Sequence, residues 1–139
     1  ENGLFSGQEL FDNGSAEAGI NRAVRVVNQT SSAGQTVTVP INVNTAGDET
    51  GYTFSISFDP AVLQVVDDPN NPNDGVVIGD LGGNVIANVN NTAGTIGFSV
   101  TSFSGTNGTI AQVTNQTLVR VTFTVSSMAM PGTTPINFT

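Results

Sequence analysis

Apolar and polar residues alternate most regularly between residues 35 and 66. In the segment TVTVPINV every second position is Val or Ile, and the positions between them are Thr, Pro or Asn. Residues 53–58 repeat the alternation with Phe54, Ile56 and Phe58. A period of two residues is typical of a β-strand with one buried and one solvated face. We therefore expect two strands here, and a corner after the second in which the side chain of Asp59 caps the turn.

Further segments continue this alternation and predict more strands. They are separated by Gly- and Asn-rich turns and lie at residues 24–26, 76–78, 84–90, 95–100 and 119–125. Eight or nine short strands at this spacing predict an all-β fold, a two-sheet antiparallel β-sandwich. The side of residues 85–89 that faces inward is left open, because Ile86 breaks the parity of its neighbours. The expected core is Val26, Val37, Val39, Ile41, Phe54, Ile56, Phe58, Leu63, Ile86, Ile96, Phe98, Val121 and Phe123.

Length and composition exclude several classes of function. The 139 residues suit one domain around a single core. Cys, His, Trp and Lys are absent, which excludes His- or Cys-based triads and zinc sites, Schiff bases and Lys-dependent phosphate loops. A net charge of -8 without a basic stripe argues against nucleic-acid binding. No run of 18 apolar residues occurs, so we expect no membrane insertion.

Carboxylates remain as candidates for catalysis or metal binding. The adjacent acids at 48–49 and 67–68 lie in predicted turns, where neighbouring side chains point apart, so we do not predict an enzyme. The loop DDPNNPNDG at 67–75 concentrates oxygen ligands of the kind that Ca²⁺ uses. A solvated loop is the alternative, and no other cofactor is expected. The candidate calcium ligands are Asp67, Asp68, Asn71 and Asp74.

Two stretches of the chain resemble the cohesin domains of bacterial scaffolding proteins. The first runs from TVTVP through a loop with Gly and acids and an aromatic strand to FDPAVLQVV; the second is GTIGFSVTSFSGTNGTI followed by TLVRVTFTV. The resemblance covers residues 22 to 139 and implies a jelly-roll sandwich. The residues that stand at the family's positions after the aromatic strand are Phe58, Asp59, Pro60, Val62 and Leu63.

The resemblance also implies a protein partner. In cohesins a sheet face that includes the aromatic strand, its neighbours and late-strand loops receives a helical dockerin. By position, the implied contact residues are Asn88, Asn90, Ser102 and Phe103, and Phe103 is the most plausible exposed aromatic residue. A carbohydrate-binding module is the rival interpretation, because related jelly rolls bind polysaccharide. Its usual Trp and Tyr platform is missing here, since Tyr52 is the only Tyr.

Residues 1–21 form a separate segment by composition, with four of the eleven acids and no Val. We interpret them as an N-terminal arm or donor segment, and residues 22–139 as the sandwich. The resemblance implies a further closing strand after PINFT, so the sandwich lacks its final strand under one hypothesis. The arm of another copy would then supply that strand and build a head-to-tail fibre. An arm that packs on its own sheet and a truncated chain are the alternatives. The arm's apolar contact residues are Leu4, Phe5, Leu10 and Phe11.

We therefore predict a non-catalytic, extracellular assembly module on a prokaryotic cell surface. The fibre subunit joined by strand donation is the first hypothesis, and a receptor for a dockerin-like partner is the second. Asn-x-Ser/Thr triplets offer candidate glycosylation sites, with ordinary turn chemistry as the other interpretation. These candidates are Asn13, Asn28, Asn90, Asn107, Asn115 and Asn137.

Overall fold

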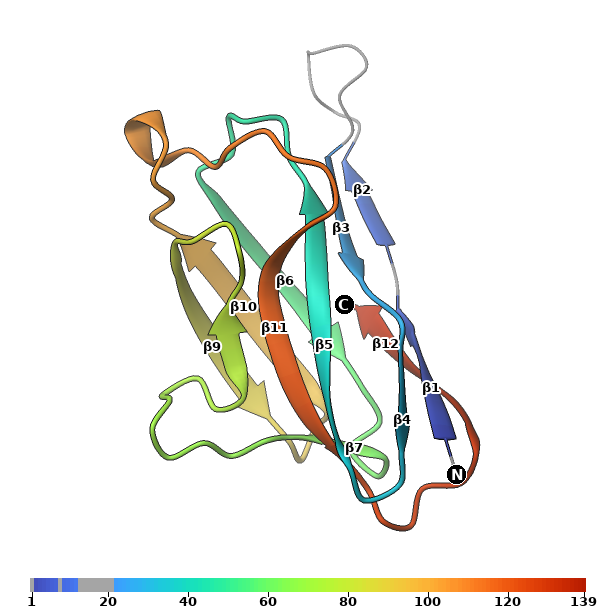
Figure 1. The fold of residues 1–139 in the computed structure, drawn as a ribbon. Helices are drawn as coiled ribbons and strands as arrows, with labels where there is room; N and C mark the ends of the chain where they lie inside the picture. Colours follow the sequence, from blue (N-terminus) through green and yellow to red (C-terminus); the bar gives the residue numbers. More distant parts are fainter. Residues whose placement is uncertain (1, 8, 13–21) are drawn as a thin grey trace.

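The computed structural model describes residues 2–7, 9–12 and 22–139, which form two β-sheets packed face to face (Figure 1). The strand order of the first sheet, called the β6 sheet, is β4-β1-β12-β6-β10-β9. Its strands are β4 (Gln29–Ser32), β1 (Asn2–Gly7), β12 (Gly132–Phe138), β6 (Gly51–Ser57), β10 (Thr95–Thr101) and β9 (Asn84–Asn90). The predicted all-β, two-sheet sandwich is confirmed.

The second sheet, called the β5 sheet, has the order β2-β3-β5-β11-β7, and β8 also pairs with β11. Among the described strands, the pair of β1 and β12 is parallel and the other pairs are antiparallel. The strands of the β5 sheet are β2 (Glu9–Asp12), β3 (Arg22–Val26), β5 (Thr36–Asn44), β11 (Gln116–Val125), β7 (Leu63–Val65) and β8 (Val76–Ile78).

The core lies between the two sheets and follows the predicted alternation. Along β5, residues 37, 39, 41 and 43 are buried, and on β11 the side chains of Val121 and Phe123 are fully buried. Fully burying an aliphatic or aromatic side chain of this size stabilises a fold by roughly 1.5–3 kcal/mol. All predicted core residues are buried except Phe54 and Ile86. Phe54 is half-buried and stacks on Phe98 with a ring-centroid distance of 4.8 Å.

Ile86 was wrongly placed in the core, since its side chain is 70% exposed. Its neighbours Val85, Ala87 and Val89 pack against the core instead. Because side chains of a strand alternate between two faces, that choice turns Ile86 outward. Three smaller apolar residues facing inward outweigh one larger residue, so this parity leaves the least apolar surface in water.

The Asp-Pro corner after β6 forms as predicted. The Asp59 carboxylate accepts a hydrogen bond from the Ala61 N–H at 2.9 Å, and its backbone carbonyl accepts bonds from the Val62 and Leu63 N–H groups. Gly94, in the turn between β9 and β10, has φ +72°, and a Cβ at this position would lie 2.2 Å from the Phe58 carbonyl oxygen. Only glycine permits this close approach of the turn to the corner.

The N-terminal segment contributes strands to both sheets of its own chain. β1 lies between β12 and β4, with Leu4 paired to Thr133 on one side and to Thr30 on the other. β2 pairs with β3, and Leu10 is opposite Val24. The PINF segment is the end of β12. β1 pairs with β12 along the edge opposite to β6. This is the arrangement in which the arm packs on its own sheet; the side chains of Leu4, Phe5, Leu10 and Phe11 lie outside the described residues.

Helical structure in the described residues is confined to a 3-10 turn at Thr106–Gly108. Within this part of the chain there is accordingly no helix with the length and apolar character needed to cross a membrane.

Candidate protein-binding face

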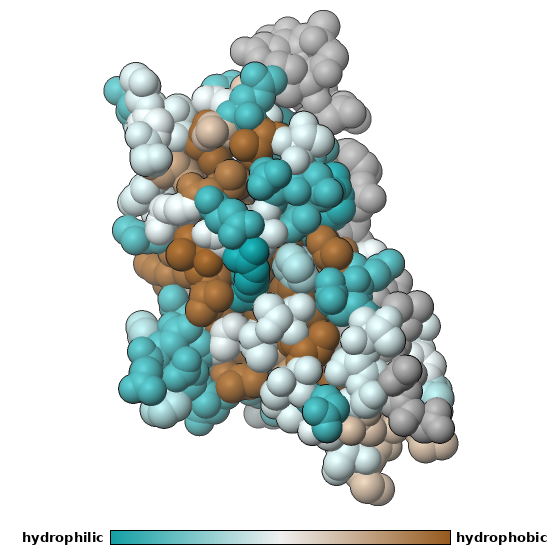
Figure 2. All heavy atoms as spheres, in the orientation of Figure 1, coloured by the Kyte–Doolittle hydropathy of each residue, from teal (hydrophilic) through white to brown (hydrophobic). Residues whose placement is uncertain are grey.

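The outer surface of β6, β10 and β9 carries no charged residue, and we call it the neutral face. None of its residues is an acid or a cation, in a chain whose net charge is -8. The opposite side of the molecule differs: the outer surface of β5 and β11 carries Arg120, paired with Asp80 at 3.1 Å, and mixes hydrophilic with hydrophobic residues (Figure 2). The outward residues of the neutral face are Gly51, Thr53, Ser55, Ser57, Asn84, Ile86, Asn88, Asn90, Thr95, Gly97, Ser99 and Thr101.

Strand register arranges these side chains in rows across the neutral face. One row joins Ile86 on β9 to Ser99 on β10 and Thr53 on β6. The next joins Asn88, Gly97 and Ser55. At Gly97 an added Cβ would meet its nearest atoms at 3.9 and 4.0 Å, so the missing side chain leaves a shallow depression between Asn88 and Ser55. The face therefore combines one exposed apolar side chain with hydroxyl and amide groups that can donate and accept hydrogen bonds.

Of the four residues that the family resemblance implied as dockerin contacts, two lie on this face. Asn88 and Asn90 are exposed on β9, and the Asn90 Oδ1 accepts hydrogen bonds from the Thr92 and Ala93 N–H groups at 3.1 and 2.9 Å. Ser102 is exposed just beyond the end of β10. Ile86 is a surface residue that the sequence prediction did not include in this site, although its mismatch with the alternation of its neighbours was the available signal.

Phe103 was wrongly predicted to be exposed; its side chain is 5% exposed and belongs to the core. Its ring meets Tyr52 edge-to-face, with 6.4 Å between the centroids. Ser102 has φ +64°, in the left-handed region, and this reverses the inside-outside alternation after β10. Gly83 lies so close to the Phe103 ring that a Cβ at residue 83 would be 3.0 Å from the Phe103 Cδ1 atom. Nothing in the sequence marks Ser102 as left-handed.

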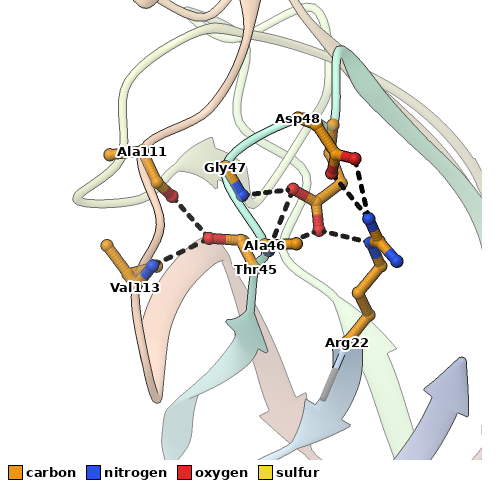
Figure 3. A network of polar contacts seen from close by, with 8 residues as sticks. Arg22, Thr45, Ala46, Gly47, Asp48, Ala111 and Val113 are labelled. Carbon is orange, nitrogen blue, oxygen red and sulfur yellow. Dashed lines mark hydrogen bonds and ion pairs between the residues drawn. The ribbon is translucent and has the colours of Figure 1, made fainter. Parts of the chain in front are cut away.

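The acidic pair Asp48 and Glu49 holds the turn between β5 and β6 (Figure 3). Arg22 Nη2 donates to both Asp48 carboxylate oxygens at 2.7 and 2.9 Å, and its Nε donates to Glu49 at 3.2 Å. Glu49 also accepts bonds from the Ala46 and Gly47 N–H groups. The hydrogen bond from Arg22 lowers the pKa of Asp48. Both carboxylates are thus engaged in fixing the turn.

Thr45 connects the same turn to residues 111–113. Its hydroxyl donates to the Ala111 carbonyl and accepts from the Val113 N–H (Figure 3). A cavity of about 280 Å³ lies beside this network, lined in part by Arg22, Glu49 and Tyr52. The buried Tyr52 hydroxyl has no hydrogen-bond partner among the described residues, and burial raises the pKa of Tyr52.

The loop at 67–75 uses its side-chain amides to bind backbone. Asn71 Nδ2 donates to the carbonyls of Asp74 and Val76, and its Oδ1 accepts from the Asn73 N–H. Asp68 accepts from the Asn70 N–H. Two of the predicted calcium ligands, Asp68 and Asn71, therefore shape turns, and a third, Asp67, is exposed. Within the described ranges, no group of three or more acidic, His or Cys side chains is arranged to hold a metal ion.

Asn73, at the end of this loop, covers the free edge of β9. Its Nδ2 donates to the Val85 carbonyl at 2.9 Å, and its Oδ1 accepts from the Ala87 N–H at 3.1 Å. An edge strand with unpaired backbone groups can pair with another chain. Asn73 occupies two of these groups, so this stretch of the β9 edge is not free to pair with another strand.

The candidate glycosylation residues are dispersed. Asn28, Asn90, Asn107 and Asn115 are exposed, and Asn137 is partly buried in β12. Asn13 lies outside the described residues.

The two packed sheets form a jelly-roll-like β-sandwich with one uncharged outer face. The sequence profile of the Cohesin domain matches residues 23–139, and the chain therefore belongs to the cohesin domain family. The resemblance stated from the sequence is confirmed. A comparison with curated proteins gave no match.

Solved cohesin structures share the fold. The sixth cohesin of Acetivibrio cellulolyticus scaffoldin B, in complex with a Cel5 dockerin mutant, has a TM-score of 0.62 at 16% identity over 78% of this chain and 74% of that chain. The Clostridium thermocellum Coh-OlpA-Doc918 complex gives 0.61 at 22% identity, with the same coverage. A non-cellulosomal cohesin from the archaeon Archaeoglobus fulgidus gives 0.51 at 16% identity over 76% of this chain and 81% of that chain.

Proposed function

We propose that this cohesin domain is a receptor on a scaffold or surface protein and binds a dockerin-like partner through the neutral face. The observation that carries the proposal is Ile86, a large apolar side chain that is 70% exposed within β9, on a face without charges. Fully buried interface centres are depleted in charged residues and rely on a few apolar or aromatic anchors surrounded by polar contacts. Two of the cohesin structures described above are complexes with dockerins, which supports a partner of that type.

The partner is expected to place an apolar pocket or groove over Ile86. Hydroxyl groups of Thr53 and Ser99 and the amide of Asn88 then offer hydrogen bonds around that anchor. The depression at Gly97 lets a partner backbone or small side chain approach the sheet closely. The chemistry favours a partner surface with apolar and hydrogen-bonding groups rather than one built on ion pairs.

Two other functions have less support. Strand donation between copies would have to displace β1, which already pairs with β12 of its own chain over residues 3–7. A carbohydrate module would need an exposed aromatic platform. Each aromatic side chain that the structure describes is buried or half-buried. The proposed receptor acts without catalysis and outside the cell.

Binding to dockerins of the source organism tests the proposal. The dockerins would be displayed on yeast and probed with the wild-type domain and with Ile86→Asp, and the affinity of positive pairs measured by calorimetry. We expect Ile86→Asp to weaken binding at least tenfold, since truncating or charging an interface anchor costs about 2 kcal/mol or more. Thr124→Asp, on the exposed outer side of β11, is the matched control and should bind like wild type. Failure of all dockerins to bind, or equal binding by Ile86→Asp, would exclude this function.

A further inference from the structure

The geometry points to Asn107 as an acceptor for N-linked glycosylation of the folded domain. Five of the six Asn-x-Ser/Thr triplets are described by the structure, at 28–30, 90–92, 107–109, 115–117 and 137–139. Of these five, only Asn107-Gly108-Thr109 has no residue in a β-strand. This inference is independent of the partner proposed above.

The Asn107 triplet belongs to a short excursion of the chain between two buried anchors. Phe103 is 5% exposed and Ile110 is 2% exposed, whereas residues 104–107 between them are exposed. The excursion projects from the end of the sandwich as a single turn (Figure 1, orange). A transferase can therefore reach it from several sides without contacting either sheet.

Surface hydrogen bonds close this excursion. The Gly105 N–H donates to the Thr109 carbonyl at 2.9 Å, the Gly108 N–H to the Gly105 carbonyl at 3.0 Å, and the Thr109 hydroxyl to the Thr106 carbonyl at 2.8 Å. Bonds of this kind open locally at low cost, because no buried apolar side chain moves with them. The triplet can thus adopt the conformation that a transferase requires while Phe103 and Ile110 stay in the core.

The acceptor nitrogen itself is available. The Asn107 side chain forms no hydrogen bond with the described residues, and apart from its own chain neighbours no heavy atom lies within 4 Å of a Cβ built on Gly108. Asn107 has φ +59°, a left-handed conformation that Asn tolerates better than most residues. The amide group therefore extends into solvent from the tip of the turn.

The other described triplets are held by the sheets. Thr117 is 8% exposed and its hydroxyl donates to Asn42, so the Asn115 triplet cannot present its hydroxyl residue. Asn137 is paired with Ser57 inside the β6 sheet. Two residues of the Asn28 triplet lie in β4. The Asn90 triplet is fixed through its middle residue, whose amide forms two bonds with Val65.

The reaction needs a lipid-pyrophosphate-linked oligosaccharide as donor. The Asn107 Nδ2 forms a bond to C1 of the first sugar, and the bond between C1 and the pyrophosphate oxygen breaks. The lipid pyrophosphate leaves, and the proton lost by the amide nitrogen passes through the transferase base to the solvent. No oxidant or reductant is required, and the amide carbonyl is unchanged.

The test uses the folded, unmodified chain made in a host without N-glycosylation. It is incubated with the lipid-linked donor and a single-subunit oligosaccharyltransferase that requires only Asn-x-Ser/Thr, and glycopeptides are identified by mass spectrometry. We expect a glycan on Asn107 and none on Asn115 or Asn137, whereas the denatured chain should accept glycans at these sites as well. Asn107→Asp and Thr109→Val should remove the Asn107 glycan, and Thr109→Ser should retain it because the hydroxyl remains.

Two results would overturn the inference: an unmodified Asn107 in the folded chain, or modification of folded Asn115 or Asn137 to the same extent as Asn107. Circular dichroism of each variant establishes that a loss of glycan does not reflect a loss of fold.

Discussion

The side-chain amide of Asn91 pairs with the backbone of Val65 as a neighbouring strand would. Asn91 Oδ1 accepts from the Val65 N–H at 2.7 Å, and its Nδ2 donates to the Val65 carbonyl at 3.0 Å. The two residues are 26 positions apart and belong to the β9–β10 turn and to β7. One side chain thus satisfies both backbone groups at the free side of an edge strand and connects the two sheets.

We expect Asn91→Ala to lower the free energy of unfolding by about 1–3 kcal/mol, the cost of leaving partly buried backbone groups without partners. Asn91→Asp should lower it at least as much, because a carboxylate oxygen would face the Val65 carbonyl. Urea unfolding followed by circular dichroism measures the change. Asn88→Ala, exposed on β9, is the control and should stay within about 0.5 kcal/mol of wild type. An Asn91→Ala variant as stable as this control would contradict the role.

Phe103 gives a second prediction for stability. Its ring is buried against Tyr52 and Gly83, so Phe103→Ala should create a cavity and cost about 3–5 kcal/mol. The control is Met128→Ala, whose side chain is 84% exposed in the turn before β12 and whose loss should be nearly neutral. Thermal unfolding of both variants makes the comparison. If both shift the melting temperature equally, Phe103 does not anchor the end of β10.

Tyr52 predicts how stability depends on alkaline pH. Burial is the main cause that raises its pKa, and the nearby Glu49 carboxylate adds to it. In the unfolded chain this pKa is about 10. Above that pH the unfolded state loses a proton that the folded state keeps, so stability is complete below pH 10 and decreases as the pH rises further.

Because Tyr52 is the only Tyr and Trp is absent, ultraviolet absorbance reports its ionisation directly. We expect tyrosinate to form only together with the loss of the β-sheet signal. Tyr52→Phe removes a buried hydroxyl that has no hydrogen-bond partner among the described residues, and it should reduce the alkaline loss of stability. Ionisation near pH 10 with the fold intact would show that the hydroxyl is solvated.

The sequence was sufficient for the fold because two-residue periodicity reports directly on burial. Residues 37, 39, 41 and 43, together with Phe58 and Phe123, are buried as the alternation requires, and the Asp59 turn follows from the chemistry of Asp-Pro. The orientation of two single side chains was less predictable. The exposure of Ile86 depends on which of two alternating faces of β9 points inward. The burial of Phe103 depends on the left-handed backbone of Ser102, which nothing in the sequence indicates.

The role of the asparagines could not be read from the sequence either. A loop rich in Asn and Asp suits calcium and turns equally well, and only the structure reveals that the amides of Asn71 and Asn73 bind backbone. The neutral face is likewise a product of register, because its residues come from three strands that are separated in sequence by loops. Pairing of Ile86 with Ser99, and of Ser99 with Thr53, brings them into one row.

The absence of charge on this face leads to the last prediction, which concerns salt. Screening weakens interactions between exposed charges, and none of the outward residues on β6, β10 and β9 is charged. The affinity for a dockerin-like partner should therefore change less than about threefold between about 0.05 and 0.5 M salt. Asn88→Lys and Asn88→Asp place opposite charges at the same exposed position. Their affinities should differ most at low salt and converge at high salt, as charge interactions across an interface do. Calorimetric titrations across this range make the measurement, and a steep loss of wild-type affinity with salt would mean that the partner binds a charged surface elsewhere on the domain.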